Sequence, residues 1–481
     1  MQVFLCYNVS LGGDNMALTS LQQVAFDTMM DGKNVFLTGK AGTGKSYVIE
    51  RFIEELDKDN RNYLVVAPTG IAAMNVGGVT IHRSFGASLQ PQISKNIQAV
   101  PDVVLQAEII IVDEISMCRV DLFDYMVRVI AKAETTSMKR KQLVVVGDFF
   151  QLPPVTTDVD YKVLKEFYPE YDKGFAFESE NWQDLDFKMI ELTEVQRQKD
   201  MPFIDALNKI RIGDESAVAF FNEHASSTKK EKGIVLCATN KEAKKMNQAQ
   251  LDELKGKSRI YHSIIEGEVK ASDKPTLDEL EFKVGARVVL LVNDTQDDLY
   301  QNGSFAAITG LKDDAVSIKL DQNNETTKIG YYNWDVEDYV IEEKMVNGVK
   351  SRQIKKTKIG SFKQLPLKLA YAITIHKSQG QTYDEVNLIP YSFDCGQLYV
   401  AISRVKSLDG LYLVRRMRKE DLICNEKVKA FYQVKNKANT NELLLDFAKK
   451  VFAMKKDIKK QFPIELLQLM QDTYDKIKQE S

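Results

Sequence analysis

Residues 34–53 read NVFLTGKAGTGKSYVIERFI, a short apolar run followed by a glycine-rich turn and a helix-like segment. Within this stretch, residues 39–46 match the pattern G-x-x-x-x-G-K-[S/T]. In such a loop the glycines let backbone N–H groups close around phosphate oxygens, the lysine supplies positive charge, and the final hydroxyl reaches Mg²⁺. The flanking strand and helix favour this interpretation over an ordinary glycine-rich turn. The residues expected to bind nucleotide phosphates, or Mg²⁺ in the case of the last, are Gly42, Thr43, Gly44, Lys45 and Ser46.

Three more apolar runs follow the first one, and polar helix-like segments separate them. They lie at residues 63–67, 109–112 and 143–146. Nearly continuous apolar runs are typical of strands that are buried on both faces of a parallel sheet. Their alternation with helices predicts an α/β fold of the doubly wound type.

A second region of this kind begins near residue 190, with apolar runs at residues 233–237, 385–389 and 411–414. Between the first two of these runs the texture changes to short strands and turns, which predicts a small inserted β domain. The expected division is a first α/β domain at 17–189, a second at 190–269 and 367–436, the insertion at 270–366, and a basic helical extension at 437–481.

The composition of the 481 residues, 44% hydrophobic and 28% charged, is that of a soluble globular protein. The sequence has neither the apolar run of ~18 residues that a membrane span needs nor the basic start of a secretory signal. Its five cysteines form no C-x-x-C pair, and its four histidines have no ligand-like spacing. We therefore expect a cytoplasmic protein without transition metal or membrane contact. Recognisable order begins only after Met16, which is an alternative start.

Two carboxylates, Asp113 and Glu114, follow the run at residues 109–112. Adjacent side chains point to opposite sides of an extended backbone, so the two can act differently. Asp113 is expected to hold Mg²⁺, and Glu114 to polarise an attacking water. Gln151 follows the next run, in GDFFQLPP, where an amide could contact both the terminal phosphate and the water. The alternative for Gln151 is a simple strand-ending turn.

Two arginines in the second half, Arg197 and Arg404, are candidates to stabilise charge on the transferring phosphate. A guanidinium supplied by a second domain also couples hydrolysis to domain closure. The alternative for each is a surface ion pair.

Two segments rich in hydroxyls and small residues, at 67–73 and 372–382, suit the phosphate oxygens of a nucleic-acid backbone. The net charge of −3 does not exclude this, because a binding groove needs only a local basic surface. His82 and Phe85 could stack on bases, although Phe85 could equally be a core residue. The expected DNA contacts are Pro68, Thr69, Thr80, His82, Phe85, Asn240, Thr374, His376 and Lys377.

In this order, the segments resemble the PIF-type (petite integration frequency) DNA helicases of superfamily 1. The resemblance covers nearly all of residues 18–432. The family's motifs correspond to residues 38–46, 67–70, 112–117, 147–154, 376–380 and 400–404.

The resemblance implies two RecA-like P-loop motor domains with ATP and Mg²⁺ between them and an SH3-like β domain in the second. It implies translocation 5′ to 3′ on single-stranded DNA and unwinding of duplex, forked or structured DNA, in replication, recombination, repair or telomere and G-quadruplex maintenance. Gln22 would read adenine, Gly380 would contact the nucleotide, and residues 86–101 would form a wedge. Gln196 replaces the aromatic residue that usually precedes the arginine at position 197. A monomer from a bacterium or phage is expected, with protein partners open.

Two other functions remain open at this stage. One is a helicase of the exonuclease V alpha-subunit type, which acts inside a nuclease complex. The other is a nucleotide-gated DNA-binding switch that moves no strand. The Glu114, Gln151 and arginine candidates disfavour a switch that does not hydrolyse ATP.

Overall fold

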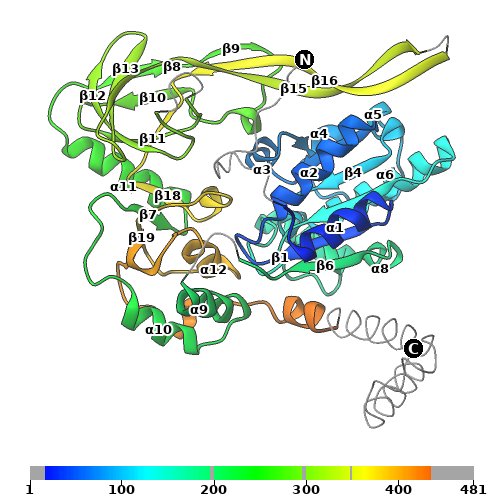
Figure 1. Cartoon of the computed structure of the whole chain (residues 1–481), viewed down its shortest axis with the longest axis horizontal. Helices are drawn as coiled ribbons and strands as arrows, with labels where there is room; N and C mark the ends of the chain where they lie inside the picture. The colour runs from blue at the N-terminus through cyan, green and yellow to red at the C-terminus, as the bar shows by residue number, and fades with distance from the viewer. Residues whose placement is uncertain (1–16, 196–199, 295–298, 347–348, 435–481) are drawn as a thin grey trace. The chain divides into compact units, whose positions relative to one another are not determined.

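The computed structural model describes residues 17–195, 200–294, 299–346 and 349–434 (Figure 1). By its internal contacts the chain divides into two units, residues 1–424 and 425–481. The second unit is described only at residues 425–434, which are helical from 426 onward. Among the described helices, none has the length and hydropathy needed to cross a bilayer.

The first half of the larger unit contains a six-stranded sheet in which all pairs are parallel. In spatial order its strands are β3 Val79–Thr80, β2 Tyr63–Ala67, β4 Ile109–Val112, β5 Gln142–Val146, β1 Val35–Gly39 and β6 Lys188–Leu192. Every residue of β1, β4 and β5 is buried, which is why the sequence shows apolar runs there. The predicted α/β fold with parallel strands is confirmed.

Helices connect the strands of this sheet. They are α1 Ser20–Met30, α2 Lys45–Lys58, α3 Gly70–Asn75, α4 Ile81–Phe85, α5 Asp102–Gln106, α6 Val120–Ser137, α7 Asp158–Phe167 and α8 Asn181–Asp184, with 3₁₀ turns η1 Ile115–Met117 and η2 Ala176–Glu178. Val48, Ile49 and Phe52 of α2 pack into one core with strand residues of β1. Residues 87–100, within the expected wedge, form neither helix nor strand.

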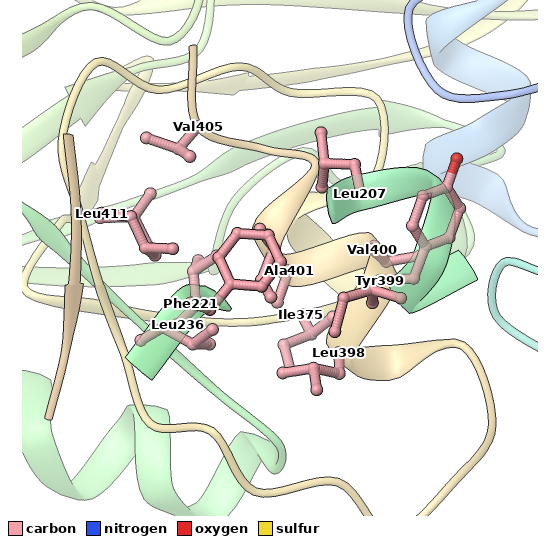
Figure 2. Close-up of a cluster of buried hydrophobic side chains, with 14 of the residues drawn as sticks. Leu207, Phe221, Leu236, Ile375, Leu398, Tyr399, Val400, Ala401, Val405 and Leu411 are labelled. Atoms are coloured by element: carbon pink, nitrogen blue, oxygen red, sulfur yellow. The ribbon is translucent and has the colours of Figure 1, made fainter. Parts of the chain in front are cut away.

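A second parallel sheet of four strands lies in the second half of the chain. In spatial order its strands are β18 Ala372–Thr374, β7 Ile234–Cys237, β19 Val386–Leu388 and β20 Leu411–Leu413. Its helices are α9 Met201–Ile212, α10 Ser216–His224, α11 Asn240–Glu253 and α12 Gln397–Ile402, with 3₁₀ turns η4 His376–Ser378, η5 Leu408–Gly410 and η6 Lys419–Asp421. Figure 2 shows its core, where Leu207 of α9, Phe221 of α10 and Val400 of α12 meet Leu236 of β7.

Antiparallel strands occupy the sequence between β7 and β18. A five-stranded sheet has the order β14 Thr326–Gly330, β13 Ala315–Leu320, β12 Phe305–Leu311, β11 Arg287–Leu290 and β17 Leu367–Leu369. The other antiparallel elements are β8 Arg259–His262 with β10 Glu279–Phe282, and β9 Ile264–Gly267 with β15 Tyr332–Val346 and β16 Val349–Gln364. The turn η3 Ala271–Asp273 precedes β10. These strands have their own apolar core, which includes Tyr261, Phe282 and Val288.

The hairpin β15–β16 is the long yellow ribbon that passes α5 in Figure 1. It covers a strand edge of the first sheet that β3 leaves open, because β3 pairs only with Val66 and Ala67 of β2. The backbone N–H of Val65 donates to the Tyr339 hydroxyl at 3.1 Å. The Asn62 side chain donates to the Arg352 carbonyl (3.1 Å) and accepts from the Ile354 N–H (2.9 Å). The hairpin thus protects an edge that would otherwise be free to pair with another chain.

Replacing Tyr339 with Phe should loosen this edge, because the buried Val65 N–H loses its acceptor. An unpaired buried donor costs about 1–3 kcal/mol, so backbone amides at residues 62–66 should exchange roughly fivefold faster or more. Hydrogen exchange followed by mass spectrometry measures this rate. The matched control is Tyr331→Phe, which removes a bond to the His262 carbonyl inside the antiparallel region. Unchanged exchange at 62–66 in Tyr339→Phe would show that the hairpin does not protect the edge.

Candidate functional site

The glycine-rich loop runs from the end of β1 to the start of α2, and two of its glycines are required by their surroundings. Gly39 has φ +146°, and a Cβ there would lie 2.5 Å from the Leu192 carbonyl oxygen. Gly44 caps α2 with φ +83°, and a Cβ there would lie 2.5 Å from Nε2 of Gln22. Any other residue would be strained at both positions, and at Gly39 its Cβ would also clash with the backbone of Leu192.

The loop is held closed by side-chain bonds to its own carbonyls. Lys45 Nζ donates to the carbonyls of Gly39 (2.7 Å) and Lys40 (3.1 Å). The Thr43 hydroxyl donates to the Lys40 carbonyl at 2.9 Å. Burial lowers the pKa of Lys45, while the nearby carboxylates oppose this shift. Ser46, the second residue of α2, is exposed at the mouth of the loop.

Gln22 of α1 packs against the phosphate loop and hydrogen-bonds to it. Its Nε2 donates to the Thr43 carbonyl (3.2 Å), and its Oε1 accepts from the Thr19 N–H (3.0 Å). The side chain is buried. Gln22 therefore lies directly against the loop, and its role in reading adenine stays a prediction.

The two carboxylates after β4 differ in surroundings. Glu114 has φ +51°, and its N–H donates to Asp113 Oδ1 at 2.7 Å. Burial, followed by the neighbouring Asp113, raises the pKa of Glu114 to about 7, although Lys45 and Arg404 oppose this. Burial also raises the pKa of Asp113. Glu114 is thus poised to take a proton near neutral pH.

A glutamine that sequence reasoning did not assign connects Glu114 to the second parallel sheet. Gln379, after η4, donates through Nε2 to Glu114 Oε2 (2.8 Å) and to Gln151 Oε1 (3.4 Å). Its own Oε1 is buried and has no hydrogen-bond partner within the described part of the chain. The only sequence signal was its place in the segment 376–380. An unpaired buried acceptor at this point indicates that a water or a ligand donates a hydrogen bond to it.

Arg404 lies two residues after the end of α12 and is 2% exposed, so the alternative of a surface ion pair is wrong. Its Nε donates to the Val400 carbonyl (2.9 Å) and its Nη2 to the Ser403 hydroxyl (2.8 Å). Burial lowers its pKa, and the charge of Glu114 opposes this. Arg197 and Gln196 lie outside the described residues.

Two further contacts join the first sheet to helices of the second, and neither was predicted. The Ala41 N–H of the loop donates to the Tyr399 hydroxyl at 2.9 Å. Figure 2 shows this hydroxyl pointing away from the apolar cluster. Asp148, after β5, accepts two 3.0 Å bonds from Arg211 of α9, whose guanidinium lies 4.5 Å from the Phe150 ring centroid. This paired geometry is the strongest form of carboxylate–arginine contact.

The threonines expected to contact DNA in the first half both cap helices. Thr69 caps α3 and accepts from the Ala72 N–H (3.2 Å), and Thr80 caps α4 and accepts from the Arg83 N–H (3.3 Å). Both are half-buried, as are Pro68 and His82. Burial lowers the pKa of His82.

Two of the predicted DNA contacts are corrected by burial. Phe85 is 1% exposed and therefore a core residue, so it presents no face for stacking on a base. Thr374 is 3% exposed, and its hydroxyl accepts from the Lys377 N–H at 3.3 Å instead of facing outward.

The remaining predicted residues lie on accessible segments. Lys377 and Gly380 are exposed and His376 is half-buried, with its pKa lowered by burial. Gly380 has φ +79°, and a Cβ there would lie 3.3 Å from Asn75 Nδ2. Asn240 is exposed at the first residue of α11.

Comparison with known proteins places these features in a family. The family model described as PIF1-like helicase matches residues 17–219. The ATP-dependent DNA helicase Pif1 of Campylobacter jejuni is 31% identical over 412 residues, which cover 79% of this chain and 88% of that protein.

Solved structures agree with this assignment. Bacteroides sp Pif1 in complex with ADP-AlF4 is 33% identical with a TM-score of 0.76, covering 88% of this chain and 98% of that one. Bacteroides Pif1 bound to ssDNA has the same identity and coverage with a TM-score of 0.62. With its phosphate loop, its paired carboxylates and the arginine that faces them, this chain therefore belongs to the PIF1-like helicase family.

Proposed function

We propose that this chain is an ATP-driven DNA helicase that translocates 5′ to 3′ on single-stranded DNA and unwinds the duplex ahead of it. One observation carries the proposal. Gln379, which lies shortly after β18 of the second parallel sheet, hydrogen-bonds Glu114 at the end of a strand of the first. The group best placed to activate water is thus held by the other half of the molecule, so hydrolysis and movement between the halves are linked.

In this proposal the two parallel sheets are the cores of two RecA-like motor domains, residues 17–189 and residues 190–269 with 367–436. The antiparallel strands β10 to β16 belong to an inserted SH3-like domain expected at 270–366. The expected bounds need correction at three places, because β8, β9 and β17 are antiparallel strands outside 270–366, and β6 of the first sheet extends to Leu192. The segment 437–481, expected to be helical, lies outside the described residues. Family membership and the order of the sheets along the chain support this division.

The residues around the phosphate loop suit ATP with Mg²⁺. Ser46 and Asp113 offer the oxygen ligands that Mg²⁺ prefers, and the orphaned Gln379 Oε1 can accept a bond from a water beside the terminal phosphate. Mg²⁺ would neutralise charge on the phosphate oxygens when bound. Lys45 can exchange its bonds to loop carbonyls for bonds to phosphate.

Hydrolysis then needs a base and a cation on opposite sides of the terminal phosphate. Glu114, as carboxylate, draws a proton from the attacking water, while Gln151 and Gln379 orient that water. Arg404 stabilises the charge that develops on the transferring group, and Arg197 is proposed to assist. ATP closes the two domains only by as much as it binds the closed arrangement better.

Single-stranded DNA is proposed to lie against Pro68, Thr69, Thr80 and His82 on one domain, and Asn240, His376 and Lys377 on the other. Contacts to the phosphate backbone make such binding tolerant of sequence and sensitive to salt. Alternating grip between the two groups would move the strand one step for each ATP. Replication, recombination, repair and maintenance of telomere-like or G-quadruplex DNA are the processes proposed to use this activity.

Activity should depend on pH through Glu114. A carboxyl group with a pKa of about 7 is protonated and inactive as a base below that pH, so DNA-stimulated ATP turnover should rise through about pH 7 to a plateau. Glu114→Gln should lower ATP turnover roughly 100- to 10,000-fold. It should also abolish the rise of turnover near pH 7, while still binding ATP. The control Glu166→Gln, at an exposed position of α7, should keep both. A wild-type pH step that persists in Glu114→Gln would assign the titration to another group.

Arg404→Ala should retain nucleotide binding but lose roughly 1,000-fold or more in ATP turnover, because its charge matters most in the transition state. Binding is measured by fluorescence with a labelled ATP analogue, and a thermal melt checks folding. The exposed Arg416→Ala is the control of equal charge change. Equal losses in binding and turnover would contradict the assigned role.

Strand polarity is tested with two substrates that share one duplex. The protein should unwind the duplex that carries a 5′ single-stranded tail, and leave intact the one that carries only a 3′ tail. Gel separation of the strands after ATP addition measures the outcome. Preference for the 3′ tail would overturn the direction proposed here.

A further inference from the structure

An open cleft of about 930 Å³ lies beside the amino ends of strands in the first sheet, and the phosphate loop lies at the carboxyl ends. Its lining includes Asn62, just before β2, Glu108, just before β4, and Gln142, the first residue of β5. These are the amino ends of parallel strands, whereas the phosphate loop follows the carboxyl end of β1. The cleft is therefore separate from both the nucleotide site and the proposed path of the single-stranded DNA.

The lining of this cleft is strongly basic. It includes one carboxylate, Glu108, and five cationic residues, Arg61, Lys139, Arg140, Lys141 and Arg352. The lining residues alone carry a formal charge of +4, and Glu134 and Glu343, which contact Lys141 and Arg352, bring it to +2, in a chain whose total formal charge is −3. Concentrated positive charge on an acidic protein is the footprint of a polyanion contact rather than a by-product of composition.

Two of the five cations are free to bind a ligand. Lys139 and Arg140 are exposed, and neither has a side-chain partner among the residues that the structure describes. The turn that carries them is fixed at both ends. α6 ends at Ser137, and the next residue, Met138, takes a left-handed conformation with φ +53°. The Lys141 N–H then donates to Glu134 Oε1 at 2.7 Å.

The other cations build the walls of the cleft. Lys141 is 4% exposed and donates to the carbonyls of Leu105 (2.9 Å) and Ala107 (2.6 Å) at the end of α5. Arg61 pairs with Glu108 at 3.2 Å. Their positive charges contribute to the electrostatic potential of the cleft, and their hydrogen bonds and ion pair fix the position of the cleft wall.

One wall comes from the inserted hairpin. Arg352 of β16 is placed there because its carbonyl accepts from Asn62, and its guanidinium pairs with Glu343 at 3.0 Å. This pair is half exposed, so a phosphate can replace Glu343 at little cost. The cleft in this form exists only while the hairpin is docked on the first sheet.

We propose that this cleft binds the phosphodiester backbone of a second DNA segment, away from the strand that is being translocated. The unpaired side chains of Lys139 and Arg140 can bind phosphate groups, and a cleft that is open to solvent has room for a continuous polymer. The segment proposed is the duplex still to be unwound, and the displaced strand is the alternative that the test separates from it. A second contact on the same DNA would keep the substrate at high effective concentration between steps.

The test uses the full chain with Lys139→Glu and Arg140→Glu combined. Binding to a blunt duplex, to a fork and to a short single-stranded oligonucleotide is measured by fluorescence anisotropy over a range of salt. Loss of two phosphate contacts should reduce the salt slope by about 1.8 for duplex DNA. Single-strand binding and single-strand-stimulated ATP turnover should stay unchanged. The control variant combines Lys229→Glu and Lys232→Glu, at two exposed positions before β7, and has the same change in charge.

The outcomes separate the sources. A reduced slope for the blunt duplex assigns the cleft to duplex DNA, and a reduction seen only with the fork's second tail assigns it to the displaced strand. Slopes equal to those of the control variant for both substrates would overturn the proposal. Equal weakening of short single-stranded DNA would also overturn it, because the cleft would then belong to the translocating strand. Failure of the proposed function, by contrast, would show as absent ATP turnover in the unaltered protein.

Discussion

The hydrogen bond between Gln379 and Glu114 is the constraint on which the rest of the site depends. It places the amide of one half of the molecule on the carboxylate of the other, in surroundings where burial holds the Glu114 pKa near neutrality. The Tyr399 bond to Ala41 and the Arg211 pair with Asp148 are two further contacts of this kind. Each joins an element of one parallel sheet to an element of the other, so the nucleotide site cannot change shape without moving both.

Much of the fold could be predicted from the sequence, because its strongest signals are local. The apolar runs at residues 63–67 and 109–112 coincide with β2 and β4, since strands buried on both faces must be apolar throughout. The phosphate loop was equally clear, since its glycines are dictated by backbone geometry at Gly39 and Gly44. These are requirements that a few consecutive residues express on their own.

The parts that could not be predicted depend on partners far along the chain. Nothing near Gln379 or Arg211 indicates which carboxylate each will contact. Phe85 has the residue type of a base-stacking side chain, and only the packing of α4 shows that it is core. Thr374 likewise has a hydroxyl suited to phosphate, but it is buried and accepts from the Lys377 N–H. The hairpin β15–β16 falls inside the predicted β domain, but neither its two long strands nor their docking on the open edge of β2 was predicted.

That docking has a consequence for how the protein is made. Val65 and Tyr339 are 274 residues apart, so β2 leaves the ribosome long before the hydroxyl that completes its edge exists. At typical synthesis speeds of 5–20 residues per second, this interval is roughly 15–55 s. The first sheet is complete once β6 has been made, and from then until Tyr339 is made its strand edge is unprotected, which is a hazard for association with other chains. The newly made first half therefore carries this exposed edge until the hairpin emerges.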